Sequence, residues 1–364
     1  MPGVATPVDQ RKQPADRATA QLPEHAFDAI LIVSFGGPEG MDDVMPFLEN
    51  VTRGRGVPRE RLLDVAHHYE LFGGVSPINA QNRALIAALE PELRAHGVDL
   101  PVYFGNRNWR PFLADTMRQM RDDGIRRALA VFTSAFSSYS GCRQYREDLY
   151  NAQQAVGPDA PEVPRLRMFF NHPGFVRANV EHVRDALSLL PPGDVHLAFT
   201  AHSIPAAMAK NCAYEAQLAE AARLVAEGVG VGDWAVAYQS RSGPPQVPWL
   251  EPDVSDHLRQ VAARGVRNVV VSPLGFVSDH LEVLYDLDVE ARATADELGL
   301  AMARAGAAGT HPAFVAGLSE LIVERLTPGA GRAALGRFGP SHDICAPDCC
   351  LPGNGRPSPW DAPD

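Results

Sequence analysis

Short apolar runs alternate with amphipathic segments along this 364-residue chain, and that rhythm restricts its fold more than any other feature. Apolar runs such as AILIVSF (29–35) are as long as buried strands, whereas segments such as NAQNRALIAALEPELRAHG (79–97) have helical spacing. Strands that alternate with helices predict βαβ units, with parallel sheets covered by helices on both faces. The expected strands are residues 29–35, 102–106, 128–136, 165–171, 195–203, 234–240 and 268–276.

So many expected strands suit two α/β halves better than one sheet. We therefore predict two similar doubly wound, Rossmann-like halves, residues 26–170 and 171–327, with a cleft between them. The second half is expected to end in a helix near residues 311–326, followed by an irregular, cysteine-containing tail over 328–364 that is rich in Gly and Pro. Residues 1–25 show no apolar periodicity and are predicted to be a disordered leader.

The charge and the apolar pattern exclude several classes of protein. A net charge of −11 argues against nucleic acid or an anionic membrane surface as the main partner. No uninterrupted apolar run is long enough to span a membrane, and the N-terminal residues lack the apolar core of a signal peptide. Five cysteines, an odd number, do not suggest a secreted disulfide framework. We therefore expect a cytoplasmic protein without a membrane-spanning segment.

Negative charge gathers just after the expected strand 268–276, in the stretch SDHLEVLYDLDVE. On an α-helix, four of its acids would share a stripe roughly 80° wide: Asp279, Glu282, Asp286 and Glu290. Such a ladder of like charges repels itself unless water or a cation neutralises it. A solvated helix face is the simpler interpretation. Ligands of open α/β sheets, however, bind at the carboxyl ends of the strands, where this ladder begins, so its position favours a cation site.

His202 lies at the carboxyl end of another expected strand, 195–203, within TAHSIP. Alone, it could equally be a capping or hydrogen-bonded histidine. With Glu282 at a second strand end, it predicts a pair of side chains that face each other across a cleft between strand ends. One imidazole and one carboxylate with open positions suit transient binding of a divalent transition metal, with Asp286 and Glu290 behind to relay it.

Glycines also follow the first expected strand, in FGGPEG (35–40). Their spacing is GGxxG rather than the GxGxxG of dinucleotide-binding loops, and Pro38 removes one amide that could hold a phosphate. A dinucleotide-dependent oxidoreductase is therefore disfavoured. The glycines are better explained as allowing the backbone to approach a flat ligand closely.

Three cysteines crowd into the tail between Cys345 and Cys350, where no core would order them. Free thiols, a zinc site and a [2Fe–2S] cluster are the alternatives. Zinc usually needs paired cysteines, whereas a [2Fe–2S] cluster takes four thiolates at irregular spacing. A fourth ligand would come from the body of the protein, from Cys142 or Cys212. Cys142 is expected at a helix N-terminus, which favours the thiolate, and Cys212 inside a helix.

Five segments, in chain order, carry a resemblance to a known family: FGGPEG, HHYELFGGVSPINAQ, TAHSIP, AYQSRSGPPQVPWLEP and GFVSDHLEVLYDLD. Over residues 27–326 the chain resembles the ferrochelatases, which insert ferrous iron into a porphyrin in haem synthesis. Its composition and cysteine pattern are most similar to the actinobacterial branch, which implies coproporphyrin III and Fe²⁺ as substrates and iron-coproporphyrin III as product. The alternatives are a protoporphyrin IX ferrochelatase, a chelatase for another tetrapyrrole or metal, and a non-catalytic haem-binding carrier.

The resemblance assigns roles to the residues at the strand ends. His202 and Glu282 match the family's active-site histidine and its facing glutamate. Asp286 and Glu290 match a carboxylate row that leads metal or protons to that pair. The residue types suit the reaction, because two pyrrole N–H protons must leave the porphyrin, and a histidine near the ring centre titrates close to neutral pH.

The same resemblance implies which residues hold the edge of the porphyrin. Four positions match contacts to its propionates: Ser76, Tyr145, Arg53 and Tyr69. Two positions depart from the pattern of relatives. Phe35 stands where many bacterial members have a tyrosine able to reach the metal, and His68 stands where some have an arginine.

Several actinobacterial members pair a cysteine of the body with three in the tail. The resemblance therefore implies a [2Fe–2S] cluster held by Cys142, Cys345, Cys349 and Cys350. Such a cluster would fasten the tail to the body and serve structure or sensing rather than turnover. A substrate with four propionates and the lack of a membrane anchor further favour a soluble monomer.

Overall fold

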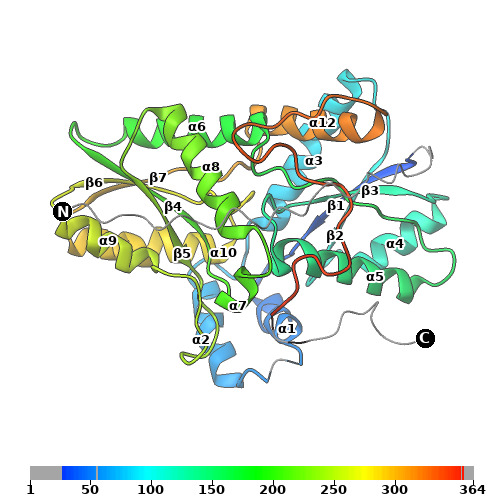
Figure 1. Cartoon of the computed structure of the whole chain (residues 1–364). Coiled ribbons are helices and arrows are strands. Elements are labelled where there is room, and N and C mark those ends of the chain that lie inside the picture. The colour runs from blue at the N-terminus through cyan, green and yellow to red at the C-terminus, as the bar shows by residue number, and fades with distance from the viewer. Residues whose placement is uncertain (1–26, 55, 354, 356–364) are drawn as a thin grey trace.

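The computed structural model describes residues 27–54, 56–353 and 355, so the predicted leader, residues 1–25, lies outside the described residues. Two parallel sheets lie side by side (Figure 1). Successive residues of their strands face opposite ways, and helices pack on both faces. One face of each sheet contributes to a single continuous hydrophobic core, so the two halves are joined by shared packing. The prediction of two parallel α/β halves is confirmed.

The first sheet has the strand order β2-β1-β3, with all strands parallel. Its strands are β1 (Ala29–Ser34), β2 (Val102–Asn106) and β3 (Ala128–Phe132), as the apolar runs predict. Around them pack α3 (Ile78–Ala95), α4 (Leu113–Asp122) and α5 (Gln144–Val156).

The predicted strand 165–171 does not form. Only its start runs beside β3, where Leu166 N–H donates to the Ala130 carbonyl at 2.7 Å. Beyond this bridge, Met168 packs into the core below the first sheet, while Phe169 and Phe170 pack into the core that the halves share. An apolar run of this kind indicates that the segment is buried. Here the segment is a linker whose side chains pack into two cores, so it is buried without being a strand.

The second sheet has the order β5-β4-β6-β7, again all parallel. Three of its strands are predicted by the sequence: β4 (Val195–His202), β5 (Trp234–Gln239) and β6 (Asn268–Ser272). The fourth, β7 (Ala301–Arg304), is a short edge strand with too little apolar pattern to be expected. Helices α8 (Tyr214–Val229) and α9 (Val254–Ala263) cover opposite faces.

Helices α6 (Pro173–Ser188) and α12 (Pro312–Leu326) begin with the same His-Pro pair. In each, the histidine Nδ1 accepts the N–H of the residue after the proline, which caps the helix. The two helices cross closely at Gly174, where a Cβ would lie 2.4 Å from the Ala313 carbonyl oxygen. Because α12 also contacts α3 of the first half, the predicted C-terminal helix packs on both halves.

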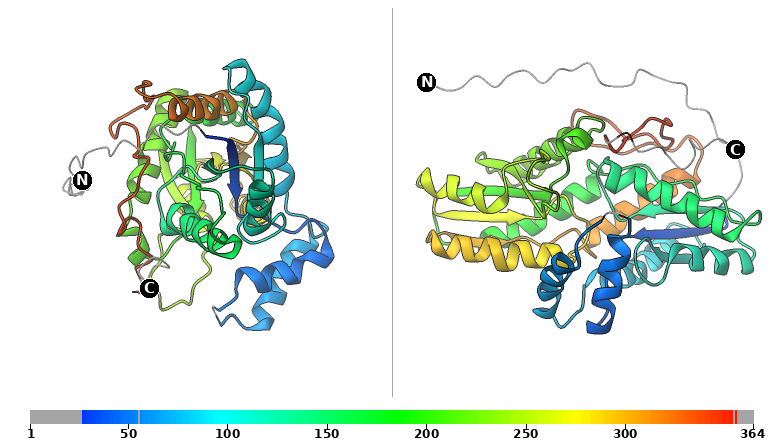
Figure 2. Two further views of the ribbon diagram at one scale, coloured as in Figure 1. Left: turned by 90° about the vertical axis from the view of Figure 1, so that its right-hand side faces the viewer. Right: turned by 90° about the horizontal axis from the view of Figure 1, so that it is seen from below.

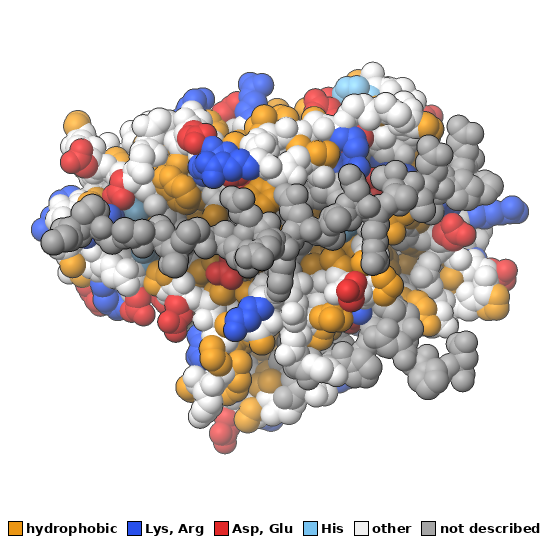
Figure 3. All heavy atoms as spheres, viewed as in Figure 1, with side chains coloured by type: hydrophobic (Ala, Val, Ile, Leu, Met, Phe, Trp, Pro, Cys, Tyr) orange, Lys and Arg blue, Asp and Glu red, His pale blue; other side chains and the backbone are white. Residues whose placement is uncertain are grey.

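Helices α1 (Met41–Val51) and α2 (Arg59–Glu70) project from the body as a separate pair (Figure 2). Val44, Phe47 and Tyr69 form its small core, which also takes in Leu281 from the second half. Hydrophobic side chains show on the surface of this α1–α2 pair (Figure 3), and those exposed on or beside it are Met41, Leu63, Leu71 and Val75.

After α12 the chain forms no helix or strand up to residue 353. This segment runs back across the molecule past α8 and α5 (Figure 1). Asn171 Nδ2 donates to the carbonyls of Leu335 (3.0 Å) and Gly339 (2.8 Å), which fixes the start of the segment. Near its end, a Cβ on Gly353 would lie 2.7 Å from the Ala207 carbonyl oxygen, in α7 (Ala206–Ala209). Within the described residues, no helix has the length and apolar character needed to cross a membrane.

Candidate functional site

His202 is the last residue of β4 and lies half-buried at the carboxyl end of the sheet. Its Nδ1 lies 2.5 Å from the Ser203 carbonyl oxygen, so Nδ1 carries the proton and donates it. In the neutral ring, Nε2 is therefore left with a free lone pair. The Tyr214 hydroxyl donates to the His202 carbonyl at 3.0 Å and holds the backbone in place. This arrangement suits a base or a metal ligand.

Glu282 faces His202, with Oε2 3.9 Å from the histidine Nε2. Glu282 lies in α10 (Leu281–Val283), which follows β6, and β6 pairs directly with β4. The sequence therefore places the pair correctly at neighbouring strand ends. Both residues come from the second half, and the two strand ends belong to one sheet.

His280 is a third group at this point that the sequence reasoning missed, although it is visible in SDHLE. Its Nδ1 lies 3.9 Å from Glu282 Oε2. Burial lowers the pKa of His280, and the Glu282 charge opposes that shift. Glu282 thus lies between two imidazoles.

The acidic stretch is not one regular α-helix. After α10 it becomes a π-helix, η2 (Leu284–Ala291), and continues as α11 (Arg292–Glu297). In an α-helix, residues four apart are rotated by about 40°, because a turn takes 3.6 residues. A π-helix has more residues per turn, since it bonds i to i+5, and so brings such residues closer to one line. The winding therefore favours alignment of Glu282, Asp286 and Glu290.

Asp279 does not belong to this row, which corrects the predicted stripe. It precedes α10 and pairs with Arg304 at 3.1 Å. Asp288 pairs with the same guanidinium at 2.7 Å. Within the described residues, no Lys or Arg side chain pairs with Glu282, Asp286 or Glu290. The stretch thus has two groups of acids. Asp279 and Asp288 are neutralised by Arg304, whereas the row of Glu282, Asp286 and Glu290 has no Lys or Arg partner among the described residues.

Asp286 is the middle carboxylate of this row. Gln239 Nε2 donates to it at 3.2 Å, and the Ser240 hydroxyl donates to the same oxygen. Ser240 has a φ of 60°, a conformation that side-chain-bearing residues adopt mainly at functional sites. Burial raises the pKa of Asp286 to about 7, against the hydrogen bond from Ser240 and with the Glu282 charge. Asp286 can therefore gain and lose a proton near neutral pH.

Glu290 lies at the outer end of the row. Burial raises its pKa, the Asp253 charge adds to the shift, and a hydrogen bond from the Tyr285 hydroxyl opposes it. The Tyr285 ring stacks on His68 of α2, with ring centroids 3.7 Å apart and planes 8° from parallel. The position where some relatives have an arginine thus contacts the π-helix.

Of the four predicted propionate contacts, Tyr145 lies in α5 and is buried. Its ring packs on Phe132 at 4.9 Å, and the Arg107 guanidinium lies 4.4 Å above it. Arg107 also lies 5.6 Å from the ring of Phe35 and pairs with Asp148 at 2.5 Å. Sequence reasoning missed Arg107, which follows β2 without any motif of its own.

The other three predicted contacts are distributed differently. Ser76 is buried beneath the FGGPEG loop and donates its N–H to the Pro38 carbonyl at 2.9 Å. A Cβ on Gly37 would lie 2.7 Å from the Ser76 Cβ, so this contact requires glycine. Tyr69 packs inside the α1–α2 pair, and Arg53 is exposed just after α1.

The cysteine site is assembled from segments far apart in the sequence. Cys142 is buried in a π-helix, η1 (Tyr139–Arg143), that leads into α5. Hydrogen bonding to Cys345 raises the pKa of Cys142 to about 12. The sulfurs of Cys349 and Cys350 lie 3.5 Å apart. The structure thus brings the four predicted cysteines together, with hydrogen bonds that join Cys142 to Cys345 and Cys350, and Cys349 to Cys345.

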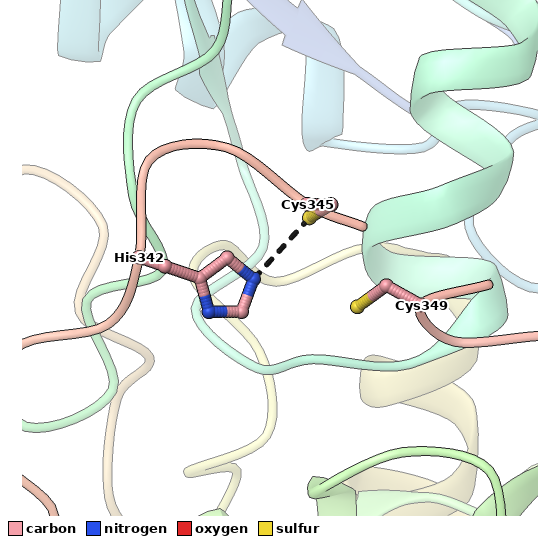
Figure 4. A group of neighbouring side chains, drawn as sticks. All are labelled: His342, Cys345 and Cys349. Atoms are coloured by element: carbon pink, nitrogen blue, oxygen red, sulfur yellow. Dashed lines mark hydrogen bonds between the residues drawn. The ribbon is translucent and has the colours of Figure 1, made fainter. Parts of the chain in front are cut away.

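His342 is a fifth donor at this site that the sequence reasoning missed, although it precedes Cys345 by three residues. Its ring points toward Cys345 and Cys349, with Nε2 3.4 Å from the Cys345 sulfur (Figure 4). Cys212 lies in the turn between α7 and α8 rather than inside a helix, which corrects the expectation. Its sulfur donates to the carbonyls of Met208 and Ala209 at 3.5 Å.

Comparison with known proteins identifies the family of the chain. Residues 27–326 match the family model described as Ferrochelatase. A protein named ferrochelatase from Rhodopirellula baltica is 58% identical over 328 residues, which cover 89% of this chain and 93% of the relative. A protein named coproporphyrin III ferrochelatase from Streptomyces griseus is 52% identical over 349 residues, with the same coverage.

Among solved structures, the chain is similar to SirB from Bacillus subtilis with Fe³⁺. The TM-score is 0.52 at 12% identity, and the match covers 84% of this chain and 98% of that one. At this low identity the likeness supports the fold alone.

Proposed function

The chain belongs to the ferrochelatase family, and from this premise we propose that it inserts Fe²⁺ into coproporphyrin III to give iron-coproporphyrin III in haem synthesis. The observation that supports this most directly is the pair at the strand ends, where His202 Nε2 faces Glu282 and a carboxylate row continues behind. Relatives named coproporphyrin III ferrochelatase, at 51–55% identity over most of the chain, support the choice of porphyrin.

The residues divide the reaction between them. As Fe²⁺ enters the ring, the porphyrin loses two pyrrole protons. His202 accepts one at Nε2, the nitrogen that its bond to Ser203 leaves free. Glu282 and Asp286 offer oxygen ligands that no Lys or Arg of the described residues occupies. Because these ligands are few and leave coordination positions open, the ion is held weakly and can be passed on. Asp286, with a pKa of about 7, can carry a released proton away along the row toward Glu290.

Substrate binding is the part of the proposal that rests on the family pattern. Ser76, Tyr145, Arg53 and Tyr69 are proposed to contact propionates, and Phe35 to lie against the ring. Phe35 supports this, since it is 37% exposed at the end of β1 although it is a large hydrophobic residue. Phenylalanine cannot ligate iron, so any protein ligand comes from the side of His202.

One assay tests the proposal against its alternatives. Purified protein is mixed anaerobically with Fe²⁺ and coproporphyrin III, and loss of porphyrin fluorescence is followed over many turnovers. Metallation of one equivalent that then stops would identify a carrier. Faster turnover with protoporphyrin IX, or with Co²⁺ in place of Fe²⁺, would identify a different chelatase.

We also propose that Cys142, Cys345, Cys349 and Cys350 hold a [2Fe–2S] cluster. The fit is supported by Cys345, which packs against the hydrophobic cluster that contains Cys142 of the body, by the sulfurs of Cys349 and Cys350, 3.5 Å apart, and by the buried guanidinium of Arg165, which contacts Cys345. When bound, the cluster would cross-link the tail to the body through Fe–S bonds.

The remaining expectations are proposals of the same kind. We propose halves at residues 26–170 and 171–327 with a tail from 328, a cytoplasmic location and a monomeric state. The division is supported by the two sheets, which lie on either side of residue 170. Light scattering of the purified protein tests the monomer.

A further inference from the structure

Three buried arginines tie the tail to the body, and two of them are paired with carboxylates. Arg143 Nε lies 3.0 Å from Glu147 Oε1, and its Nη1 donates to the Pro347 and Cys349 carbonyls. Arg167 forms two bonds of 2.8 Å to Glu324 and donates to the Ala333 carbonyl at 2.8 Å. In both cases a neighbouring acid balances the buried cation.

Arg165 is also buried, at 6% exposure, but no carboxylate of the described residues pairs with it. Its Nη1 donates to the Leu166 carbonyl at 2.8 Å. Its Nη2 donates to the His342 carbonyl at 3.1 Å and to the Cys345 sulfur at 2.9 Å. A buried cation without an anion costs several kcal/mol, so this site requires negative charge from another source.

The cysteine sulfurs are the groups that can supply that charge. Four neutral thiols would leave the guanidinium unbalanced. Four thiolates on a [2Fe–2S] cluster carry a net negative charge, by the formal charges of iron, sulfide and thiolate.

We propose that Arg165 is the built-in counter-ion of the [2Fe–2S] site and that it positions the Cys345 thiolate for ligation, an inference that rests on the proposed cluster. His342 Nε2 lies 3.4 Å from the same sulfur (Figure 4). Hydrogen bonds to ligand sulfurs are a known means by which a protein stabilises and tunes such a cluster.

The test compares neutral variants of two matched arginines. Arg165→Met removes the counter-ion, whereas Arg167→Met, two residues away, removes another buried cation that also holds the tail but has no hydrogen bond to a sulfur. Each protein is purified anaerobically and its iron and sulfide per chain are measured. The decay of its visible absorption is then followed in the presence of a strong iron chelator. We expect Arg165→Met to lose the cluster roughly 10–100-fold faster than wild type, and Arg167→Met to lose it at the wild-type rate.

Two further variants separate charge from packing. Arg165→Lys keeps the charge and should recover most of the cluster lifetime. Arg165→Gln keeps a hydrogen-bond donor without the charge and should not recover it. The same two variants test the proposal if Arg165→Met fails to fold. Equal lifetimes in wild type and Arg165→Met, or equal acceleration by Arg165→Met and Arg167→Met, would overturn the counter-ion role while leaving the cluster in place. Wild-type protein without iron and sulfide would overturn the cluster and this inference together, and the chelatase assay would still report on the proposed activity separately.

Discussion

His202 is the single side chain on which turnover should depend most. Replacing it by alanine removes the acceptor for a pyrrole proton while the proposed propionate contacts lie elsewhere. We expect His202→Ala to lower kcat by roughly 10²–10⁴-fold with little change in the affinity for coproporphyrin III. Steady-state kinetics and fluorescence titration measure the two effects.

The neighbouring His280→Ala variant is the matched control for His202. His280 also lies 3.9 Å from Glu282, but it follows β6 rather than ending β4. Its loss should lower kcat far less. An His202→Ala variant that keeps more than about a tenth of the wild-type rate would remove His202 from the mechanism.

The sequence could predict this pair but not its surroundings, for a physical reason. His202 and Glu282 follow strands that end at the same edge, and that is a property of any parallel sheet. By contrast, Arg107 reaches Tyr145, and Arg165 reaches Cys345 across 180 residues of sequence, only because of how the elements pack. No local pattern encodes such contacts.

The helix that carries the carboxylate row shows a similar limit. Apolar spacing predicts a helix but cannot distinguish α from π winding, since both bury one face. The stretch therefore appeared to hold four aligned acids, whereas Asp279 lies before the helix and pairs with Arg304. The apolar pattern of β7 was too weak for the strand to be predicted. In residues 165–171 the apolar pattern reflected burial, although no strand forms there.

Position along this helix predicts graded effects on catalysis. Glu282 is proposed to contact the site of metal insertion, so Glu282→Gln should chiefly lower kcat. Glu290 lies two turns further out, so Glu290→Gln should chiefly raise the KM for Fe²⁺. Asp288→Asn, on the side neutralised by Arg304, is the control and should change neither. Effects of Glu282→Gln and Glu290→Gln that are as small as that of the control would mean that the row is only a solvated surface.

Asp286 should make iron uptake depend on pH. Its pKa is raised to about 7, so the carboxylate is charged above that pH and takes a proton below it. The KM for Fe²⁺ should therefore rise as the pH falls from 8 to 6. In Asp286→Asn the KM should be high throughout and lack this pH dependence. A wild-type KM that is flat over the same interval would contradict the role of Asp286.

The stability of the whole fold should depend on a histidine pair at the other end of β4, about 20 Å from His202 by the rise of a strand. His196 and His257 are buried with Nε2 atoms 2.8 Å apart, and Asp233 and Arg264 contact His196. Burial lowers the pKa of His257 to about 4 and also lowers that of His196.

The sign of this effect follows from the proton balance. Between about pH 6.5 and pH 4 the unfolded chain protonates His257 and the folded chain does not, so the free energy of unfolding should fall as the pH falls through this interval. The lowered pKa of His196 acts in the same direction. His257→Gln should lessen the loss, and the exposed His67→Gln should not. Urea unfolding at pH 8 and pH 5 measures the difference, and equal slopes in wild type and His257→Gln would contradict it.

The tail connects the cysteine site to both halves and should therefore respond as a unit when the cluster is lost. Arg143 and Arg165 hold it to the first half, and Gly353 packs on α7, which follows His202 by a few residues.

Cys142→Ser removes a proposed ligand from the body. We expect it to abolish the reddish-brown colour, to lower iron and sulfide from about two each per chain, and to make residues 340–353 the first site of limited proteolysis. Cys212→Ser alters a thiol that donates to the carbonyls of Met208 and Ala209 and is not a proposed ligand, so it should keep the colour and the protected tail. The reverse pattern would move the fourth ligand to Cys212, and colourless wild-type protein containing zinc would show that His342 and the cysteines bind a different metal.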